Sequence, residues 1–184
     1  MMAARLTGTG LAILLALASP ALAQEGAPNV VEGHPTNAFM PGFPETIDGL
    51  ARESIQSKPA EGRIVANYRA PDDNRLVQML LYALYDGDIA RNIERAEAYM
   101  ADGEIPVTRA SVTSPAGRKM ECLTTRVDDQ GHTLCVAEIL GRALNVQVSD
   151  VVAADADAIP DDKIAAAHDL AGRMVDSVSE APEG

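Results

Sequence analysis

The sequence predicts an α+β fold, in which one antiparallel sheet of about six to seven strands has a helix after its first hairpin and a second helix at the C-terminal end. Three observations lead to this class. Short apolar runs follow one another between turn residues over 107–152, which is typical of consecutive antiparallel strands. Residues 88–101 and 161–178 instead repeat their apolar side chains at helical spacing.

The first hairpin is expected from two apolar runs that flank a turn. Residues 63–69 read RIVANYR and predict a strand that ends at the turn residues 70–74. The next run, 75–87, has the Leu and Met content of a helix but the length and turn-bounded edges of a buried strand. We interpret it as the second strand of the hairpin, and the choice between strand and helix stays open for 76–86.

The helix after this hairpin is predicted over 88–101. Charged side chains occupy one face, and Gly103 follows as a stop signal. The opposite, apolar face is formed by Ile89, Ile93, Ala96 and Met100. This pattern is typical of an amphipathic helix that packs on a sheet.

The second half of the domain is predicted to be a meander closed by a helix. Its β-rich stretches are 107–114, 117–127, 132–140 and 142–152. They are separated by Ser-Pro-Ala-Gly, by Asp-Asp-Gln-Gly and by a lone Gly141. The final helix, 161–178, begins with two Asp residues, whose charge is favourable at the positive end of the helix dipole. Its apolar stripe consists of Ile164, Ala167, Ala171, Met174 or Val175, and Val178.

A family resemblance rests on the hairpin sequence IVANYRAPDDNRLVQMLLYALYDG, which has a Tyr in each strand and an Asp-Gly exit into a helix. This stretch resembles the opening of the PsbP-like α/β/α sandwich proteins, and the order of the later elements is similar. The resemblance is one of pattern and carries over no functional residue by position. It implies an accessory or assembly protein of a larger complex rather than an enzyme, although a shared fold does not fix a function.

The chain is expected to comprise four parts. Residues 1–23 contain one Arg, an apolar run from Leu11 to Leu17 and small residues up to Ala23, which is typical of a bacterial secretory signal peptide. We expect 24–42 to be a flexible tether, 43–178 a single α+β domain and 179–184 a tail. The apolar run is shorter than the roughly 20 residues that span a bilayer. The expectation is therefore a periplasmic or secreted protein without stable membrane insertion after cleavage.

The expected tether contains apolar residues that are unusual in a solvated segment. They are Val30, Val31, Phe39 and Met40, with Phe43 directly after them. They either dock onto another protein or lie against the domain. We favour the second for Phe39 to Phe43, because a terminal segment is usually disordered unless it is tied down in this way.

The charge of the chain excludes two classes of partner. It has 15 Lys and Arg against 27 Asp and Glu, a formal net charge of −12 at pH 7. Such a surface repels phosphate backbones and anionic lipid headgroups, which bind proteins through Lys and Arg. The absence of Trp also removes a residue on which single-stranded nucleic acid stacks. Nucleic-acid binding is therefore not expected.

The two cysteines, Cys122 and Cys135, are predicted to form a disulfide, because two cysteines in an exported protein usually pair. Two alternatives stay open. Cys122, His132 and Cys135 offer three zinc ligands, although their spacing fits no usual zinc pattern. Cys122 activated by His132 would be a nucleophile, which requires an unpaired thiolate.

The remaining polar candidates give weaker patterns. The stretch 149–162 contains acidic residues that offer calcium ligands, namely Asp150, Asp155, Asp157, Asp161 and Asp162. Pro160 stands where an EF-hand loop needs Gly, so that motif fails and a solvated acidic loop is the preferred interpretation. His34 lies in the expected tether and His168 at the edge of the last helix's apolar stripe. The three histidines, His34, His132 and His168, thus lie in three separate elements. No Ser-His-Asp arrangement can be read from their positions.

The sequence thus assigns no catalytic, cofactor-binding or metal residues. The leading hypothesis is a non-enzymatic accessory or protein-interaction domain with one disulfide, whose partner is an unknown envelope protein. The alternatives are a small periplasmic hydrolase with an unrecognised site, since many active sites are assembled from distant positions, and a carrier of a small ligand or metal.

Overall fold

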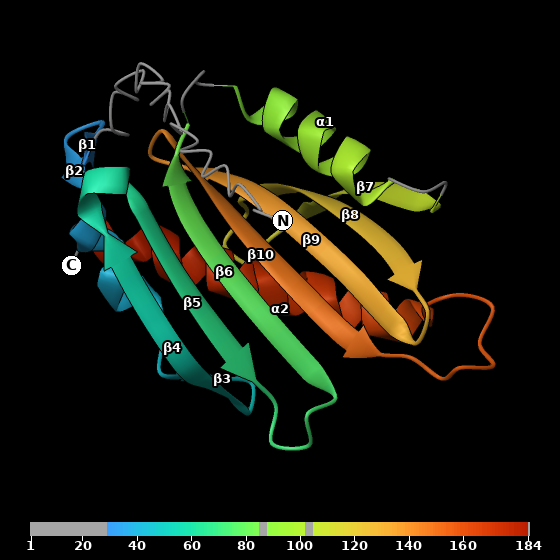
Figure 1. Ribbon diagram of the computed structural model, residues 1–184. Helices are drawn as coiled ribbons and strands as arrows, with labels where there is room; N and C mark the ends of the chain where they lie inside the picture. The colour runs from blue at the N-terminus through green and yellow to red at the C-terminus, as the bar shows by residue number, and fades with distance from the viewer. Residues whose placement is uncertain (1–28, 85–87, 102–104, 184) are drawn as a thin grey trace, which may run out of the picture.

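A computed structural model of the 184-residue chain describes residues 29–84, 88–101 and 105–183. The described part contains an eight-stranded antiparallel sheet in the order β3-β4-β5-β6-β10-β9-β8-β7 (Figure 1). The α+β class is therefore confirmed, whereas the expected number of six to seven strands is too small. The strands of this sheet are β3 (Thr46–Ile47), β4 (Leu50–Lys58), β5 (Arg63–Arg69), β6 (Arg75–Ala83), β7 (Val107–Thr113), β8 (Lys119–Val127), β9 (Gln130–Ile139) and β10 (Arg142–Val151).

The sheet consists of two meanders that meet along one ladder. The meander β3 to β6 precedes helix α1 (Ile89–Met100), and the meander β7 to β10 follows it. The ladder between β6 and β10 runs antiparallel from the Ala83–Arg142 pair to the Arg75–Asp150 pair. At that last pair the guanidinium of Arg75 donates two hydrogen bonds to the carboxylate of Asp150, at 2.7 and 2.9 Å.

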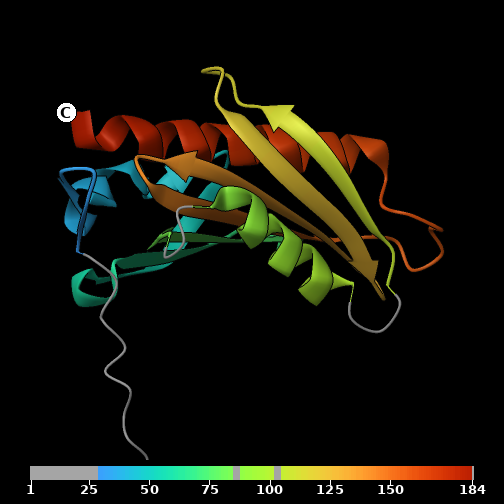
Figure 2. The same cartoon turned by 90° about the horizontal axis from the view of Figure 1, so that it is seen from above.

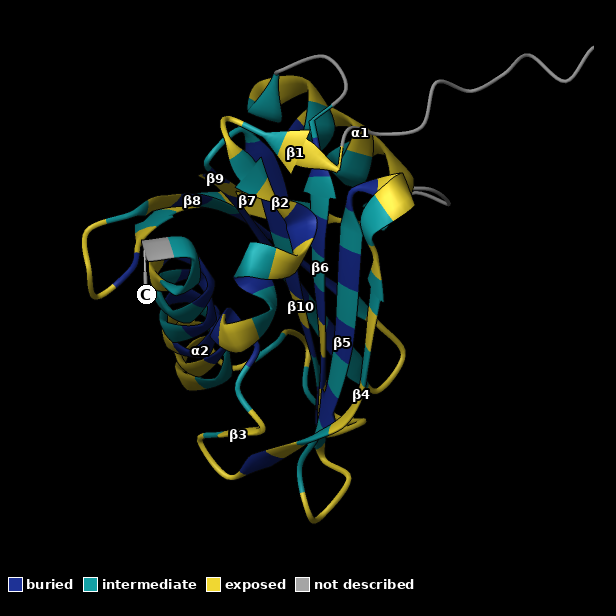
Figure 3. Cartoon of the chain, turned by 90° about the vertical axis from the view of Figure 1, so that its left-hand side faces the viewer, coloured by how far each residue is buried: buried dark blue, intermediate teal, exposed yellow. Residues whose placement is uncertain are grey.

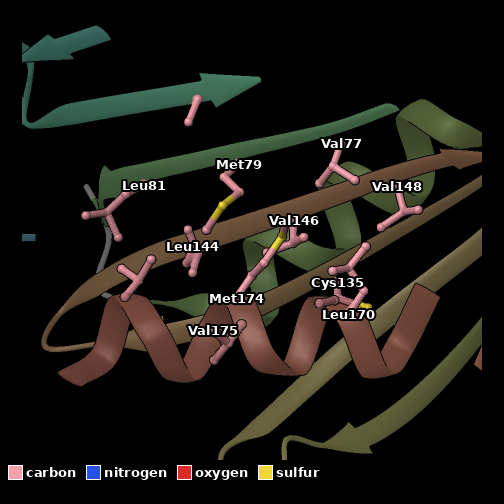
Figure 4. Packing of buried hydrophobic residues seen from close by; sticks show 14 of the residues in the cluster. Val77, Met79, Leu81, Cys135, Leu144, Val146, Val148, Leu170, Met174 and Val175 are labelled. Carbon is pink, nitrogen blue, oxygen red and sulfur yellow. The ribbon is translucent and has the colours of Figure 1, made fainter. Parts of the chain in front are cut away.

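The main core lies between one face of the sheet and helix α2 (Asp161–Glu180), which Figure 2 shows running along the sheet. Alternate residues of the central strands are buried on this face, as the period of two requires. Figure 4 shows Met79 and Val146 of the sheet together with Leu170, Met174 and Val175 of α2 in this core. The predicted stripe of the last helix is confirmed at Ala167, Ala171, Met174, Val175 and Val178, which are all buried.

A second, smaller core lies on the opposite face of the sheet, beneath α1. Its buried members are Ile93 of α1, Leu123 of β8, Val136 of β9 and Ala143 of β10. The side chain of Asp88 caps the helix by accepting hydrogen bonds from the backbone N–H groups of Ala90 and Arg91. The predicted helix is therefore confirmed, while its expected stop signal, Gly103, lies outside the described residues.

The strand predictions differ from the structure in the first meander. Strand β5 has the predicted bounds, and β6 confirms the strand interpretation up to Ala83. The preceding strands β3 and β4 were not expected, so the predicted hairpin is the inner part of a longer meander. In β4 only Leu50 is buried, and a mostly solvated strand lacks the apolar alternation that predicts strands.

The N-terminal segment is part of the domain from residue 29 onward, which differs from the tether expected over 24–42. Two short strands, β1 (Val30–Val31) and β2 (His34–Pro35), pair with each other and lead into the 3-10 helix η1 (Thr36–Gly42). Phe39 and Phe43 are buried, as the interpretation that they lie against the domain requires. Residues 24–28 of the expected tether, and the predicted signal peptide 1–23, lie outside the described residues.

The approach of η1 to α2 requires a glycine. A Cβ atom on Gly42 would lie 2.5 Å from the Cα of Val178 and 2.7 Å from the carbonyl oxygen of Ser177. The C-terminal boundary shifts as well, because α2 continues to Glu180 with Ser179 buried, and η3 (Ala181–Glu183) follows. Figure 3 shows buried, intermediate and exposed positions along α2 and the strands. Among the described helices, none is long and apolar enough to cross a membrane.

Candidate functional site

An apolar pocket of about 390 Å³ lies between the C-terminal half of α1 and the sheet. We call the sheet face that α1 partly covers the outer face. The pocket is lined from α1 by Ala96, Tyr99 and Met100, and from the outer face by Thr125, Val127, His132, Leu134 and Gln147, with Ile105 between them. Strands β8, β9 and β10 bring these residues together, because side chains of one strand parity share one face of a sheet.

Polar contacts hold α1 in place above the pocket. At its N-terminal end the hydroxyl of Tyr82 contacts Asn92 Oδ1 at 3.2 Å and Asn145 Oδ1 at 3.4 Å. Burial raises the pKa of this Tyr82 hydroxyl, so it stays protonated and able to donate. On the other side of the helix, Glu97 pairs with Arg109 of β7 at 3.7 Å. The pocket is therefore a formed hollow between two anchored elements.

The rim of the pocket carries exposed apolar and aromatic surface. Tyr99 is 84% exposed and Val127 is 39% exposed. Tyr is a residue type that supplies a large share of the binding energy at protein interfaces. An aromatic side chain this open beside an apolar hollow is therefore suited to contact another molecule.

Few polar groups converge in the pocket. His132 Nδ1 lies 2.9 Å from the hydroxyl of Ser149, and burial lowers the pKa of His132, so the imidazole is neutral near pH 7. The hydroxyl of Thr125 donates to the carbonyl of Pro106 at 2.9 Å. The lining residues include no carboxylate and no cysteine. A base oriented by an acid, as catalytic triads use, is therefore not found among the residues that line this pocket.

A second hollow, of about 360 Å³, continues the outer face toward β4. It is polar: Gln78 Nε2 donates to Asn67 Oδ1 at 3.1 Å, and Asn67 Nδ2 donates to Ser54 Oγ at 2.9 Å. Gln147 of β10 lines both hollows and is exposed. The two hollows are thus parts of one surface, with an apolar end beneath α1 and a polar end over β5 and β6.

The predicted disulfide joins Cys122 and Cys135 on the face of the sheet that packs against α2. The two residues are directly paired in the β8–β9 ladder, with Cα atoms 4.0 Å apart. The turn between the strands is tighter than expected, because β9 begins at Gln130 rather than at residue 132.

Loss of this disulfide should cost stability. For the double variant C122A/C135A we expect the free energy of unfolding to fall by about 3 kcal/mol, since a 13-residue separation constrains the unfolded chain by this order. Urea denaturation of the oxidised protein measures the difference. Reductant should lower the stability of the wild type and leave the double variant unchanged, and equal sensitivity of both to reductant would contradict the prediction.

The histidines are placed differently from the sequence hypotheses. His132 pairs with Thr125 in the β8–β9 ladder, three residues from the Cys122–Cys135 pair, and so faces the outer side, away from the disulfide. The proposed set Cys122, His132 and Cys135 is therefore wrong as a metal or nucleophile site. His168 of α2 lies near the two cysteines instead. His34 packs edge-on against Phe39, with ring centroids 6.3 Å apart.

The acidic stretch does not converge on one point. Asp150 is buried in its pair with Arg75, and Asp161 and Asp162 are exposed in the first turn of α2. Asp155 and Asp157 are exposed in the loop that precedes this helix. These positions agree with the preferred interpretation of a solvated loop.

A fully buried arginine, Arg142 of β10, was missed by the sequence analysis. Its guanidinium donates to the carbonyl oxygens of Gly62 at 3.1 Å, Asn29 at 3.0 Å and His34 at 3.2 Å. It also lies 5.3 Å from the centroid of the Phe39 ring, a cation–π distance. Arg142 thus ties the N-terminal segment to the middle of the chain.

Comparison with models of known protein families and with curated proteins finds no match for this chain.

Proposed function

We propose that the chain is an exported, non-enzymatic accessory domain that binds a segment of an envelope protein across its outer face. The observation that carries the proposal is the pair of adjoining hollows that share Gln147. One isolated apolar pocket would suit a small molecule, whereas an apolar hollow continued by a polar surface suits a longer chain.

The chemistry of the surface indicates the kind of segment. An aliphatic or aromatic side chain fits the hollow beneath α1, where Ala96, Met100 and Leu134 supply apolar contacts. The neighbouring backbone would lie over β10, toward the amide and hydroxyl groups of Asn67, Gln78 and Ser149. The net charge of −12 disfavours an acidic segment, so we propose a neutral or basic one.

Two features support a binding function rather than catalysis. The lining of the apolar hollow contains one imidazole and no carboxylate. The resemblance to the PsbP-like group, whose members are mostly accessory or assembly proteins, points the same way by analogy. Export remains part of the proposal and rests on the N-terminal sequence.

A photo-crosslinking experiment in intact cells tests the proposal. A photoreactive phenylalanine analogue is placed singly at Tyr99, at Gln147 and, as a control, at Ala166, which is exposed on α2 on the other side of the sheet. We expect the same envelope protein to be captured from positions 99 and 147 and not from 166. Capture that is equal at all three positions, or only at 166, would overturn the assignment of the surface.

The variant Tyr99→Ala provides a matched control for folding. Because Tyr99 is 84% exposed, we expect its loss to change the free energy of unfolding by less than about 0.5 kcal/mol. The same change should reduce capture from position 147. Unchanged capture would show that the apolar end of the surface is not used.

The hydrolase alternative is favoured by one contact, the 2.9 Å approach of His132 Nδ1 to Ser149 Oγ. A serine activated by a neutral histidine is the minimal nucleophile of that class. We expect a fluorophosphonate probe to leave Ser149 unmodified in the folded protein. Stoichiometric modification of Ser149, read by peptide mass spectrometry, would favour the hydrolase over the binding domain.

A further inference from the structure

Three metal-ligating side chains meet between the sheet and α2. The sulfur atoms of Cys122 and Cys135 and a ring nitrogen of His168 all lie within 4.8 Å of one another. They come from β8, β9 and α2, three elements whose packing forms the main core. In the oxidised protein the two sulfur atoms are bonded to each other, so neither is available as a thiolate.

His168 has a ligand position that no protein group uses. Its Nε2 atom is buried and makes no hydrogen bond within residues 29–84, 88–101 and 105–183. A buried polar nitrogen without a partner is uncommon, because leaving it unpaired costs about 1–3 kcal/mol.

A cavity at the surface reaches one member of this cluster, His168. Its volume is about 420 Å³, and it lies between α2 and the turn that joins β7 to β8. His168 lines it, together with Val112, Ser114 and Ala165. A small ion can therefore approach the cluster from the His168 side.

We propose that the reduced form of this protein binds one zinc ion through Cys122, Cys135 and His168, and that the disulfide closes the same site. Two thiolates on one zinc ion lie about 3.8 Å apart, since each Zn–S bond is about 2.3 Å long. The three ligand atoms already lie within 4.8 Å, so binding requires only small side-chain rotations. A water molecule would complete the tetrahedron that zinc prefers.

The charge balance favours a divalent ion at this depth. Two thiolates and a neutral imidazole carry two negative charges, which Zn²⁺ cancels. A monovalent ion would leave one uncompensated negative charge among buried side chains, and an unpaired buried charge is costly. Both cysteines are buried, so the difference in residual charge favours a divalent ion over a monovalent one.

The switch between the two forms is a two-electron exchange. A dithiol reductant attacks the disulfide, becomes a disulfide itself and leaves Cys122 and Cys135 as thiols. Zinc binding then releases two protons as the thiols become thiolates. The proposal therefore requires a dithiol-type thiol-disulfide exchange partner, and it does not depend on the docking surface proposed above.

Zinc titration of the mature protein under anaerobic conditions tests the site. The oxidised and the reduced protein are each titrated with Zn²⁺, and with Co²⁺ as a spectroscopic probe of thiolate ligation. We expect one equivalent to bind to the reduced protein, with a thiolate-to-cobalt charge-transfer band, and none to bind to the oxidised protein. We also expect zinc to raise the melting temperature of the reduced protein, because a ligand of the folded state stabilises it.

Two histidine variants separate the proposed ligand from its neighbour. His168→Gln should weaken zinc binding by about tenfold or more, whereas His132→Gln, on the outer face of the sheet, should leave it unchanged. Equal affinity of the two variants would overturn the proposal. If the reduced protein is unfolded before zinc is added, zinc must restore the native circular dichroism spectrum, and failure to do so would equally overturn it.

Discussion

The variant Arg142→Met is expected to lower the free energy of unfolding by about 2–4 kcal/mol, because it removes a buried charged donor from three backbone carbonyls. The methionine keeps much of the side-chain volume but cannot donate to the carbonyls of Gly62, Asn29 and His34. A hydrogen bond from a charged donor contributes about 1.5–3 kcal/mol, and the carbonyl of Asn29 keeps its bonds from the backbone N–H and the hydroxyl of Thr36 after the change. Denaturation by urea, followed by circular dichroism, measures the loss.

Arg126 offers a matched control for this prediction. It also donates to backbone carbonyls, those of Asp128, Ala153 and Ala154, but it lies at the surface. Water can replace its guanidinium, so Arg126→Met should cost less than about 1 kcal/mol. A similar loss in both variants would show that burial of Arg142 is not what makes it important.

The variant Arg142→Lys separates charge from shape. Lysine keeps the positive charge but lacks the planar group that reaches several acceptors at once. We expect it to recover only part of the stability lost in Arg142→Met. Full recovery would show that charge alone holds the N-terminal segment.

Truncation of Phe39 is the second change with a large expected effect. Its ring is fully buried, belongs to the main core and lies against both Arg142 and His34. Phe39→Ala removes a large apolar side chain and leaves a cavity, for which about 3–5 kcal/mol is typical. The result would show that η1 is an integral part of the domain.

Val30 is the control for Phe39. It lies in the same N-terminal segment but is 53% exposed, so Val30→Ala should change stability by less than about 0.5 kcal/mol. Both variants are compared by urea denaturation of the purified protein. If Phe39→Ala lowered the free energy of unfolding as little as Val30→Ala, η1 would be only loosely attached to the domain. The expectation of a flexible tether over 24–42 would then be correct for this segment.

The sequence predicted elements well where one face of a strand or helix is buried and the other is not. Strands β5 and β6 and helix α2 have this pattern, and the predicted bounds of β5 to β10 and of both long helices differ little from the observed ones. Strand β4 lacks it because it lies near the sheet edge and buries only Leu50. Strand β7 also has no buried residue, but the turn residues Ser-Pro-Ala-Gly that follow it mark its end in the sequence.

The sequence around the cysteines contains enough information to predict their register as well as their pairing. A two-residue turn at Asp128 and Asp129 places Cys122 opposite Cys135, and Asp128 has the positive φ of 53° that such tight turns need. With Cys135 on one face of β9, His132 must lie on the other, since neighbouring positions alternate. Strand parity alone therefore excludes the Cys122, His132 and Cys135 set.

The other functional residues depend on contacts between distant parts of the chain. His168 reaches the cysteines only because α2 packs on that face of the sheet. Arg142 has one signal in the sequence, since it shares strand parity with the buried Leu144 and Val146. Its carbonyl acceptors lie up to 113 residues away in the sequence, and no sequence pattern indicates them.

The ladder between β6 and β10 also sets the order in which the domain can fold. Its two strands are separated in sequence by up to 75 residues, as the Arg75–Asp150 contact shows. The first meander is synthesised before β10 exists, so β6 has an unpaired edge until the second meander and the last helix are available. The entropy of closing so long a loop is lost before the hydrogen bonds of the β6–β10 ladder stabilise the sheet. A sheet with such distant strand pairs is expected to fold slowly. During that interval the unpaired edge of β6 can pair with other chains, which is the route by which exposed strand edges lead to aggregation.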